Sequence, residues 1–159
     1  MSISHVNDSS IDHVIITWDN RPGMFLTQIQ SNISDPEHER IVRSFLSIGN
    51  WDDVLFMAEG VYERKSRSMD LRAFAYPVDN LKTTDPDYAI FVFEGVNICD
   101  GAFEYINLSE PAFTRLMAQL FNVLISGATR TQLPVIHEDW WERFVELAGD
   151  ISQRAQHLT

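Results

Sequence analysis

SEPAFTRLMAQLFNVLISGAT, residues 109–129, is the stretch that decides the fold. Ser109, Glu110 and Pro111 have the pattern of a helix start: a capping hydroxyl, an acid near the positive end of the helix dipole, and a proline in the first turn. From Phe113 onward apolar residues cover most of the helix, and the polar residues form one stripe: Arg115, Gln119, Asn122 and Ser126. A helix with so narrow a polar stripe is largely buried, and Gly127 is expected to end it. The sequence therefore predicts a buried helix over 110–126 that lies on one face of a sheet.

Three strands are predicted before this helix. Residues 70–78 alternate between apolar and polar, as a half-buried strand does. Residues 88–96 are almost continuously apolar, which favours a central strand that is covered on both faces. Residues 98–108 read as a turn and a further strand, because Asp100-Gly101 is a typical hairpin dipeptide.

The N-terminal part begins with a predicted hairpin. Residues 11–18 are rich in β-branched side chains and predict a strand. Residues 20–23, Asn-Arg-Pro-Gly, suit a type II turn, so residues 24–31 can pair back as a second strand.

Three further helices are predicted. One begins at Asp35, a capping residue followed by proline, and is closed by Gly49. Asn50 can cap the next, whose apolar stripe runs from Trp51 to Tyr62. The last begins near Glu138, where acids fill the first turn, and its inward residues are Trp140, Phe144, Leu147, Ala148 and Ile151.

The element order is thus ββ-αα-βββ-αα. Because strands come in runs and do not alternate with helices, we expect an α+β fold with a mostly antiparallel sheet of about five strands and helices packed on it. The chain of 159 residues suits a single globular domain over 1–159, with residues 1–10 as a flexible N-terminal tail.

Charge restricts the partners that this chain can bind. The formal net charge is −11, from 12 basic and 23 acidic residues. Contacts with phosphate need clustered Lys and Arg, and the one basic run, residues 63–67, has acidic neighbours. Neither nucleic acid nor an anionic membrane is therefore an expected partner. The chain has one cysteine, which excludes an internal disulfide, and it begins without a secretory pattern, so we expect a cytoplasmic protein.

Candidate motifs for chemistry have simpler structural interpretations. HEDWWERF, residues 137–144, starts like a zinc-protease helix but has Trp141 where the second histidine must stand. Asp85-Pro86-Asp87 is common turn chemistry as well as a possible cation ligand. Cys99 lies among acids in sequence, which disfavours a thiolate, so we expect a quiet, half-buried thiol. Adjacent helical residues point about 100° apart, so one of Trp140 and Trp141 is expected in the core and the other at its margin. No catalytic residue, metal ligand or cofactor site is predicted.

Acidic residues beside the predicted turns give the functional hypothesis. If the strands at 70–78, 88–94 and 102–107 are neighbours, several of these acids gather on one rim of the sheet: Asp79, Asp85, Asp87, Glu94, Asp100 and Glu104. One interpretation is a solvated face that keeps the protein in solution. The other is electrostatic recognition of a basic protein partner.

The size, acidity, lone cysteine and loop acids such as Asp85, Asp87, Asp100 and Glu104 resemble those of bacterial immunity proteins, which neutralise nuclease-type toxins. The resemblance implies a basic toxin as partner, an acidic face placed over the toxin's active site, and no enzymatic activity. Two other classes stay open. One is an adaptor subunit that docks through a sheet edge or an apolar patch. The other is a small-molecule enzyme that uses carboxylates, alone or with a bound metal.

Overall fold

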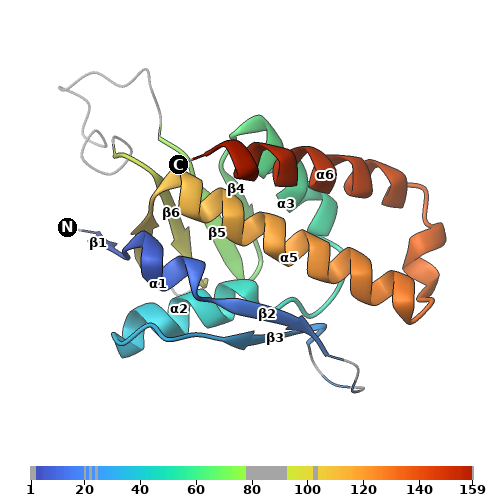
Figure 1. Ribbon diagram of the computed structural model, residues 1–159, viewed down its shortest axis with the longest axis horizontal. Helices are drawn as coiled ribbons and strands as arrows, with labels where there is room; N and C mark the ends of the chain where they lie inside the picture. Colours follow the sequence, from blue (N-terminus) through green and yellow to red (C-terminus); the bar gives the residue numbers. More distant parts are fainter. Residues whose placement is uncertain are drawn as a thin grey trace.

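The computed structural model describes residues 3–19, 21, 23, 25–77, 93–101 and 104–158 (Figure 1). The expected α+β class is confirmed. The elements follow one another in the order β1 (Ser4–His5), α1 (Asp8–Asp12), β2 (Ile15–Trp18), β3 (Thr27–Gln30), α2 (Pro36–Leu46), α3 (Val54–Glu63), β4 (Arg67–Met69), β5 (Arg72–Ala75), β6 (Val96–Cys99), β7 (Tyr105–Leu108), α5 (Glu110–Arg130), the 3-10 helix η1 (Pro134–His137) and α6 (Trp141–His157).

The main sheet has five strands in the order β1-β7-β6-β5-β4. Only the β1–β7 pair is parallel, so the sheet is mostly antiparallel, as predicted. The central strand is β6, and its four residues are all buried, as in a strand covered on both faces. The sequence predicted this character for residues 88–96. Of these, 88–92 lie outside the described residues and 93–95 precede the strand, so the predicted position was wrong and only Val96 belongs to β6.

Residues 70–78 were predicted as one strand, but residues 70–75 form the turn and second strand of a hairpin, and Val78 lies outside the described residues. Arg67–Met69 forms β4 and Arg72–Ala75 forms β5, with Met69 opposite Arg72. The turn between them is therefore Asp70-Leu71. The alternating pattern concealed this turn, because Asp70-Leu71 has no glycine and so lacks the dipeptide that usually marks a two-residue hairpin loop.

The predicted N-terminal hairpin is confirmed, but it stands apart from the main sheet. Strands β2 and β3 pair antiparallel, with Ile16 opposite Ile29, and form a two-stranded sheet of their own. The first strand is shorter than predicted, because Asn7 caps a short helix, α1, over residues 8–12. Asn20 and Pro22 of the predicted turn lie outside the described residues.

Residues 3–10, the described part of the predicted flexible tail, are attached to the fold. Ser4–His5 pairs with Ile106 and Asn107 of β7, and the ring of His5 lies 2.6 Å from the side-chain oxygen of Asn107. Ile11 of α1 is buried. A run without sequence periodicity thus adds a strand to the sheet through backbone pairing, which side-chain pattern does not reveal.

Helix α2 begins as predicted, because the Asp35 carboxylate accepts hydrogen bonds from the amides of Glu37 and His38. It ends at Leu46, before Gly49. The hydroxyl of Thr27 donates to the Leu46 carbonyl and accepts from the amide of Ile48. A tertiary contact from β3 therefore ends this helix. Asn50 accepts a bond from the Asp52 amide, and α3 begins only at Val54.

Helix α5 starts as predicted, with the Ser109 hydroxyl accepting from the amide of Ala112. It does not end at Gly127 but runs to Arg130, and Gln132 in a left-handed conformation follows it. Gly127 instead gives room to the Trp18 indole: a Cβ on Gly127 would lie 2.0 Å from an indole carbon. The predicted burial of this helix is confirmed, since Leu120 and Phe121 are fully buried.

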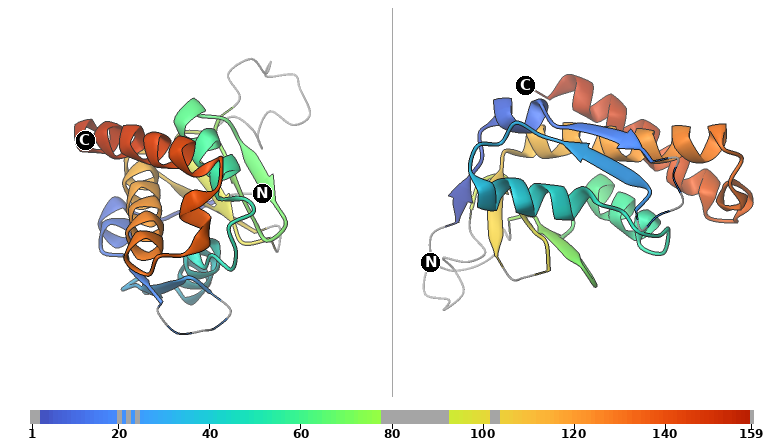
Figure 2. Two further views of the ribbon diagram at one scale, coloured as in Figure 1. Left: turned by 90° about the vertical axis from the view of Figure 1, so that its right-hand side faces the viewer. Right: turned by 90° about the horizontal axis from the view of Figure 1, so that it is seen from below.

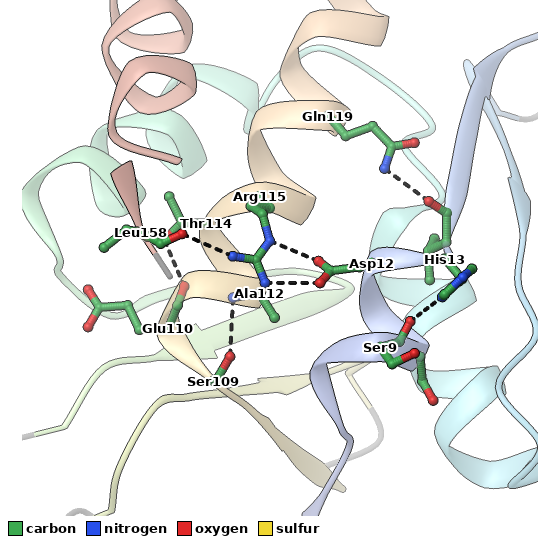
Figure 3. A network of polar contacts seen from close by, with 12 residues as sticks. Ser9, Asp12, His13, Ser109, Glu110, Ala112, Thr114, Arg115, Gln119 and Leu158 are labelled. Carbon is green, nitrogen blue, oxygen red and sulfur yellow. Dashed lines mark hydrogen bonds and ion pairs between the residues drawn. The ribbon is translucent and has the colours of Figure 1, made fainter. Parts of the chain in front are cut away.

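Two residues of the polar stripe of α5, Arg115 and Gln119, bind the N-terminal segment (Figure 3). Arg115 makes a bidentate pair with Asp12, at 2.9 and 3.0 Å. The Gln119 amide donates to the Val14 carbonyl, and its oxygen accepts from the amide of Ile16. Arg115 and Gln119 therefore hold the N-terminal segment in place, while Asn122 bonds the Ser152 hydroxyl of α6 and Ser126 is exposed.

The core lies between the main sheet and the helices. Phe74, Ile98 and Ile106 stand in register on one sheet face and are buried. Phe74 contacts Phe45 of α2 and Phe113 of α5. Helix α6 lies beside α5 and α3, as Figures 1 and 2 show.

Helix α6 starts at Trp141, three residues after the predicted Glu138, because η1 occupies residues 134–137 first. Its predicted inward residues Phe144, Leu147 and Ile151 are buried. Trp141 is buried and Trp140 is half-buried, which confirms the interpretation of this pair.

Candidate functional site

The structure divides the six predicted partner-binding acids into separate groups. Asp79, Asp85 and Asp87 lie outside the described residues. Glu94 is exposed and lies just before β6. Asp100 directly follows β6, so the whole strand, about 13 Å at 3.3 Å per residue, lies between these two acids.

Asp100 and Glu104 come together on one arginine of α2. The Arg40 guanidinium binds the Asp100 carboxylate through one Nη, lies 3.4 Å from Glu104 and is 2.5 Å from Glu37 of its own helix. The Asp100 side chain is only 4% exposed. These hydrogen bonds and charges raise the pKa of Arg40, with the bond to Glu37 contributing most. Arg40 therefore partly neutralises two of the acids that the sequence put forward for partner binding.

A pocket of about 200 Å³ lies at the same end of the sheet as Asp100. It opens between the α2–α3 connection and the β4–β5 turn. The Asp70-Leu71 turn stands beside the β6–β7 loop, since a Cβ on Gly101 would lie 3.1 Å from the Leu71 carbonyl oxygen. The pocket is lined by charged and apolar side chains of three kinds: the acids Asp52, Asp53 and Asp70, the cation Arg72, and the apolar residues Phe25, Val54, Met57, Met69 and Leu71.

Arg72 is the buried cation of this pocket. The residue is 9% exposed, and one Nη donates a 2.8 Å hydrogen bond to the Ser47 carbonyl at the end of α2. Its Nε is buried with no hydrogen-bond partner among the described residues. Burial lowers the pKa of Arg72, and the charge of Asp53 opposes that shift. A buried guanidinium without a carboxylate in contact is costly, so the fold holds Arg72 here at the expense of stability.

The three carboxylates of the pocket are available. Asp52 and Asp70 are exposed, and within the described part of the chain Asp52, Asp53 and Asp70 enter no ion pair. Asp53 precedes α3 but makes no capping hydrogen bond with its side chain. Three acids and one arginine leave a net charge of −2 around the pocket. Among the described residues no group of His, Cys, Asp or Glu side chains is arranged to hold a metal ion.

Two large apolar side chains flank the pocket. Leu71 is 68% exposed at the tip of the β4–β5 turn, and Phe25 is 42% exposed before β3. Phe25 and Ser47 also line a second, more open hollow. Exposed apolar residues beside a depression with polar edges are the usual anatomy of a protein interface.

Helix α6 carries a second acidic surface. Glu142, Glu146 and Asp150 are exposed and repeat at intervals of four residues, the spacing of neighbours on a helix face. None of them belongs to an ion pair in the described ranges. Because like charges at this spacing destabilise a helix slightly, this surface adds to the negative potential without adding to stability.

The sequence predictions missed the pocket for identifiable reasons. Asp70, Leu71 and Arg72 were assigned to one strand, so their turn was not recognised. Asp52 and Asp53 were placed inside the predicted helix that starts after Asn50. A strand interrupted by Asp-Leu-Arg is the one available signal, because an acid and an arginine are both rare in buried strands.

Other predicted candidates carry no site. Cys99 is 4% exposed, more buried than the half-buried position expected of it. His137 is exposed at the end of η1. In the described part of the chain no helix is both long enough and apolar enough to cross a bilayer.

No protein-family model, curated protein or solved structure matches this chain. The assignment of function therefore depends on the geometry of the described residues alone.

Proposed function

We propose that this chain is an acidic binding protein that neutralises a basic protein partner, in the manner of a toxin-immunity protein, and that the pocket face is its contact surface. This face consists of Asp52, Asp53, Asp70, Phe25 and Leu71. The observation that carries the proposal is the combination of three unpaired carboxylates with two exposed apolar side chains around one concavity. Apolar anchors supply affinity at an interface, while charge supplies specificity and a fast encounter.

The distribution of paired charges supports this proposal. Most described basic side chains are used within the fold, as with Arg115 on Asp12, Arg64 on Glu110 and Arg43 on Glu39. The acids in excess stay unpaired at the pocket and on α6. The electrostatic potential outside the protein is therefore negative, and it attracts a basic partner from a distance.

An adaptor that docks through a sheet edge has less support. The edge of β2 that does not pair with β3 is covered by Gln119, whose side chain hydrogen-bonds the Val14 carbonyl and the Ile16 amide. On β3 the Ile29 carbonyl accepts from Arg43. The edge strands of the main sheet, β1 and β4, have two and three residues, and such short strands offer little for pairing.

A cell that makes a toxin holds its antidote in the cytoplasm, and a chain without an internal disulfide suits that reducing compartment. The proposed activity is inhibition by contact and requires no catalytic group in this protein.

The test starts with affinity capture from the producing cells, using the wild-type protein and Asp52→Asn/Asp70→Asn in parallel. Both aspartates are exposed, and their carboxylates make no ion pair in the described residues, so this variant is expected to fold normally. The captured protein that depends on these aspartates is then identified, and its binding kinetics are measured at several salt concentrations.

A matched control is Glu142→Gln/Glu146→Gln, which removes two charges from α6. We expect both double variants to lower the on-rate, and this effect to fade as salt screens the charges. Only the pocket variant is expected to raise the off-rate, by about 30-fold or more, which corresponds to about 2 kcal/mol. Equal off-rates for wild type and the pocket variant would exclude the pocket face as the contact surface. An on-rate that does not change with salt would mean that the acidic residues only keep the protein solvated.

A further inference from the structure

The floor and the mouth of the pocket have opposite charges. Arg72 lies at the floor with one Nη bound to Ser47 and a buried, unpaired Nε. Its other Nη makes no hydrogen bond in the described residues and is not enclosed, and Arg72 is one of the residues that line the pocket. A guanidinium prefers a carboxylate, which it binds through two parallel N–H groups.

The mouth of the pocket, which carries aspartates, favours a cation. Asp53 is close enough to influence Arg72 electrostatically, yet the two do not form an ion pair. Asp52 and Asp70 have no cation in contact within the described residues. A ligand that carries a carboxylate and a cation a short distance apart can bind Arg72 and the aspartates at the mouth at the same time.

The walls favour a methylene chain between those charges. Val54 and Met57 are buried and line the pocket together with Met69. Methionine adapts its shape to the side chain that it contacts. At about 200 Å³ the pocket is below the roughly 300–1,000 Å³ of sites for drug-sized ligands, so it suits one residue and not a longer segment.

We infer that the pocket binds the C-terminal residue of a basic protein chain, a lysine or arginine with a free α-carboxylate. The carboxylate meets Arg72, the aliphatic stem lies along Met57 and Met69, and the terminal cation meets Asp52 and Asp70. This inference rests on the proposed function and specifies which part of the partner enters the pocket.

Arg72 also has a structural role, which the test must separate from recognition. Its bond to Ser47 satisfies a carbonyl at the end of α2, where a cation is favourable to the helix dipole. Replacing Arg72 can therefore destabilise the fold. Changes in the ligand avoid this difficulty, because they leave the protein intact.

The experiment is calorimetric titration of the wild-type protein with four probes. These are acetyl-Gly-Ser-Gly-Lys with a free carboxylate, the same peptide amidated, acetyl-Gly-Ser-Gly-Leu with a free carboxylate, and free lysine. Loss of one charge-assisted contact is expected to weaken binding roughly 10- to 100-fold. We therefore expect the amidated peptide and the leucine peptide each to bind at least about 10-fold more weakly than the first.

Protein variants complete the test. Asp52→Asn/Asp70→Asn should remove the preference for lysine over leucine and keep the preference for a free carboxylate. Arg72→Lys, where it folds, should reduce the carboxylate preference. Glu142→Gln/Glu146→Gln serves as the control of equal charge and should change neither preference.

Equal affinity for the amidated and free peptides would overturn the inference, as would failure of all four probes to bind. Free lysine binding as tightly as the first peptide would overturn it in favour of a small-molecule site. The binding kinetics of the captured partner test the proposed function separately. If its off-rate depends on Asp52 and Asp70 while none of the peptides binds, the pocket does not take a C-terminal residue, but the proposal of a basic protein partner stands.

Discussion

Gly127 offers a sharp test of how α5 and the β2–β3 hairpin fit together. In most helix interiors glycine is less favourable than alanine by about 1 kcal/mol. At this position, however, a Cβ would lie 2.0, 2.2 and 2.5 Å from three carbons of the Trp18 indole. Non-bonded carbons are stable near 3.5–4.0 Å, so the indole, which also contacts Trp51, would have to move.

We expect Gly127→Ala to destabilise the protein. Overpacking costs about 1–3 kcal/mol, and three close contacts favour the upper end of that range. Subtracting about 1 kcal/mol of helix propensity leaves a net loss of about 1–2 kcal/mol. For a chain of this size, that lowers the melting temperature by about 2–8 °C.

Gly149→Ala is the matched control, because Gly149 is exposed within α6 and nothing lies within 4 Å of its Cβ position. The same substitution there should stabilise the protein by about 0.5–1 kcal/mol. The assay is urea unfolding followed by tryptophan fluorescence, with the midpoint compared at constant slope.

A third variant separates packing from helix termination. If Gly127 were the end of the helix, as its sequence context indicates, Gly127→Ala would be unfavourable whatever residue stood at position 18. Because the indole is the obstacle, adding Trp18→Leu should remove most of the penalty of Gly127→Ala in a double-mutant cycle. If Gly127→Ala stabilises as Gly149→Ala does, or the cycle shows no coupling, the packing of Trp18 on α5 is refuted.

Three further outcomes are expected. Leu120→Ala should cost about 2–5 kcal/mol in unfolding free energy, because Leu120 is fully buried in α5, and an unchanged urea midpoint would contradict that burial. Cys99 should react with a thiol reagent only as fast as the protein unfolds, since it is 4% exposed; rapid labelling of the folded protein would show that the β6–β7 end opens readily. The amide hydrogen bonds to Asp35, from His38 first and then Glu37, lower the pKa of this carboxyl. Wild type should therefore have a higher free energy of unfolding than Asp35→Ala at pH values above the pKa of Asp35 in the unfolded chain. This difference should be lost as the pH falls through the lower pKa of Asp35 in the folded protein, which urea unfolding from pH 6 to pH 2 can measure.

The sequence by itself determined the class of the fold and the starts of two helices, α2 and α5. Ser109 and Asp35 cap the helices that were expected to begin there, because a capping side chain bonds amides within its own turn and needs no distant partner. The burial of α5 likewise followed from its narrow polar stripe, since periodicity records which face is apolar. The pairing of β2 with β3 is also local, because the two strands are close neighbours in the chain.

Tertiary structure alone decided where the helices end and which acidic side chains are paired within the fold. Gly127 and Gly49 are both plausible helix ends by sequence, but Trp18 requires the first within α5, and Thr27 ends α2 before the second is reached. The positions of acidic residues in the sequence predicted an acidic rim of the sheet that includes Asp100 and Glu104. However, Arg40, about 60 residues away in sequence, pairs with both. The pocket arises where the β4–β5 turn meets the end of α2. Its chemistry depends on Arg72 being enclosed by residues that no local pattern connects to it, because burial is a property of the folded whole and not of a segment.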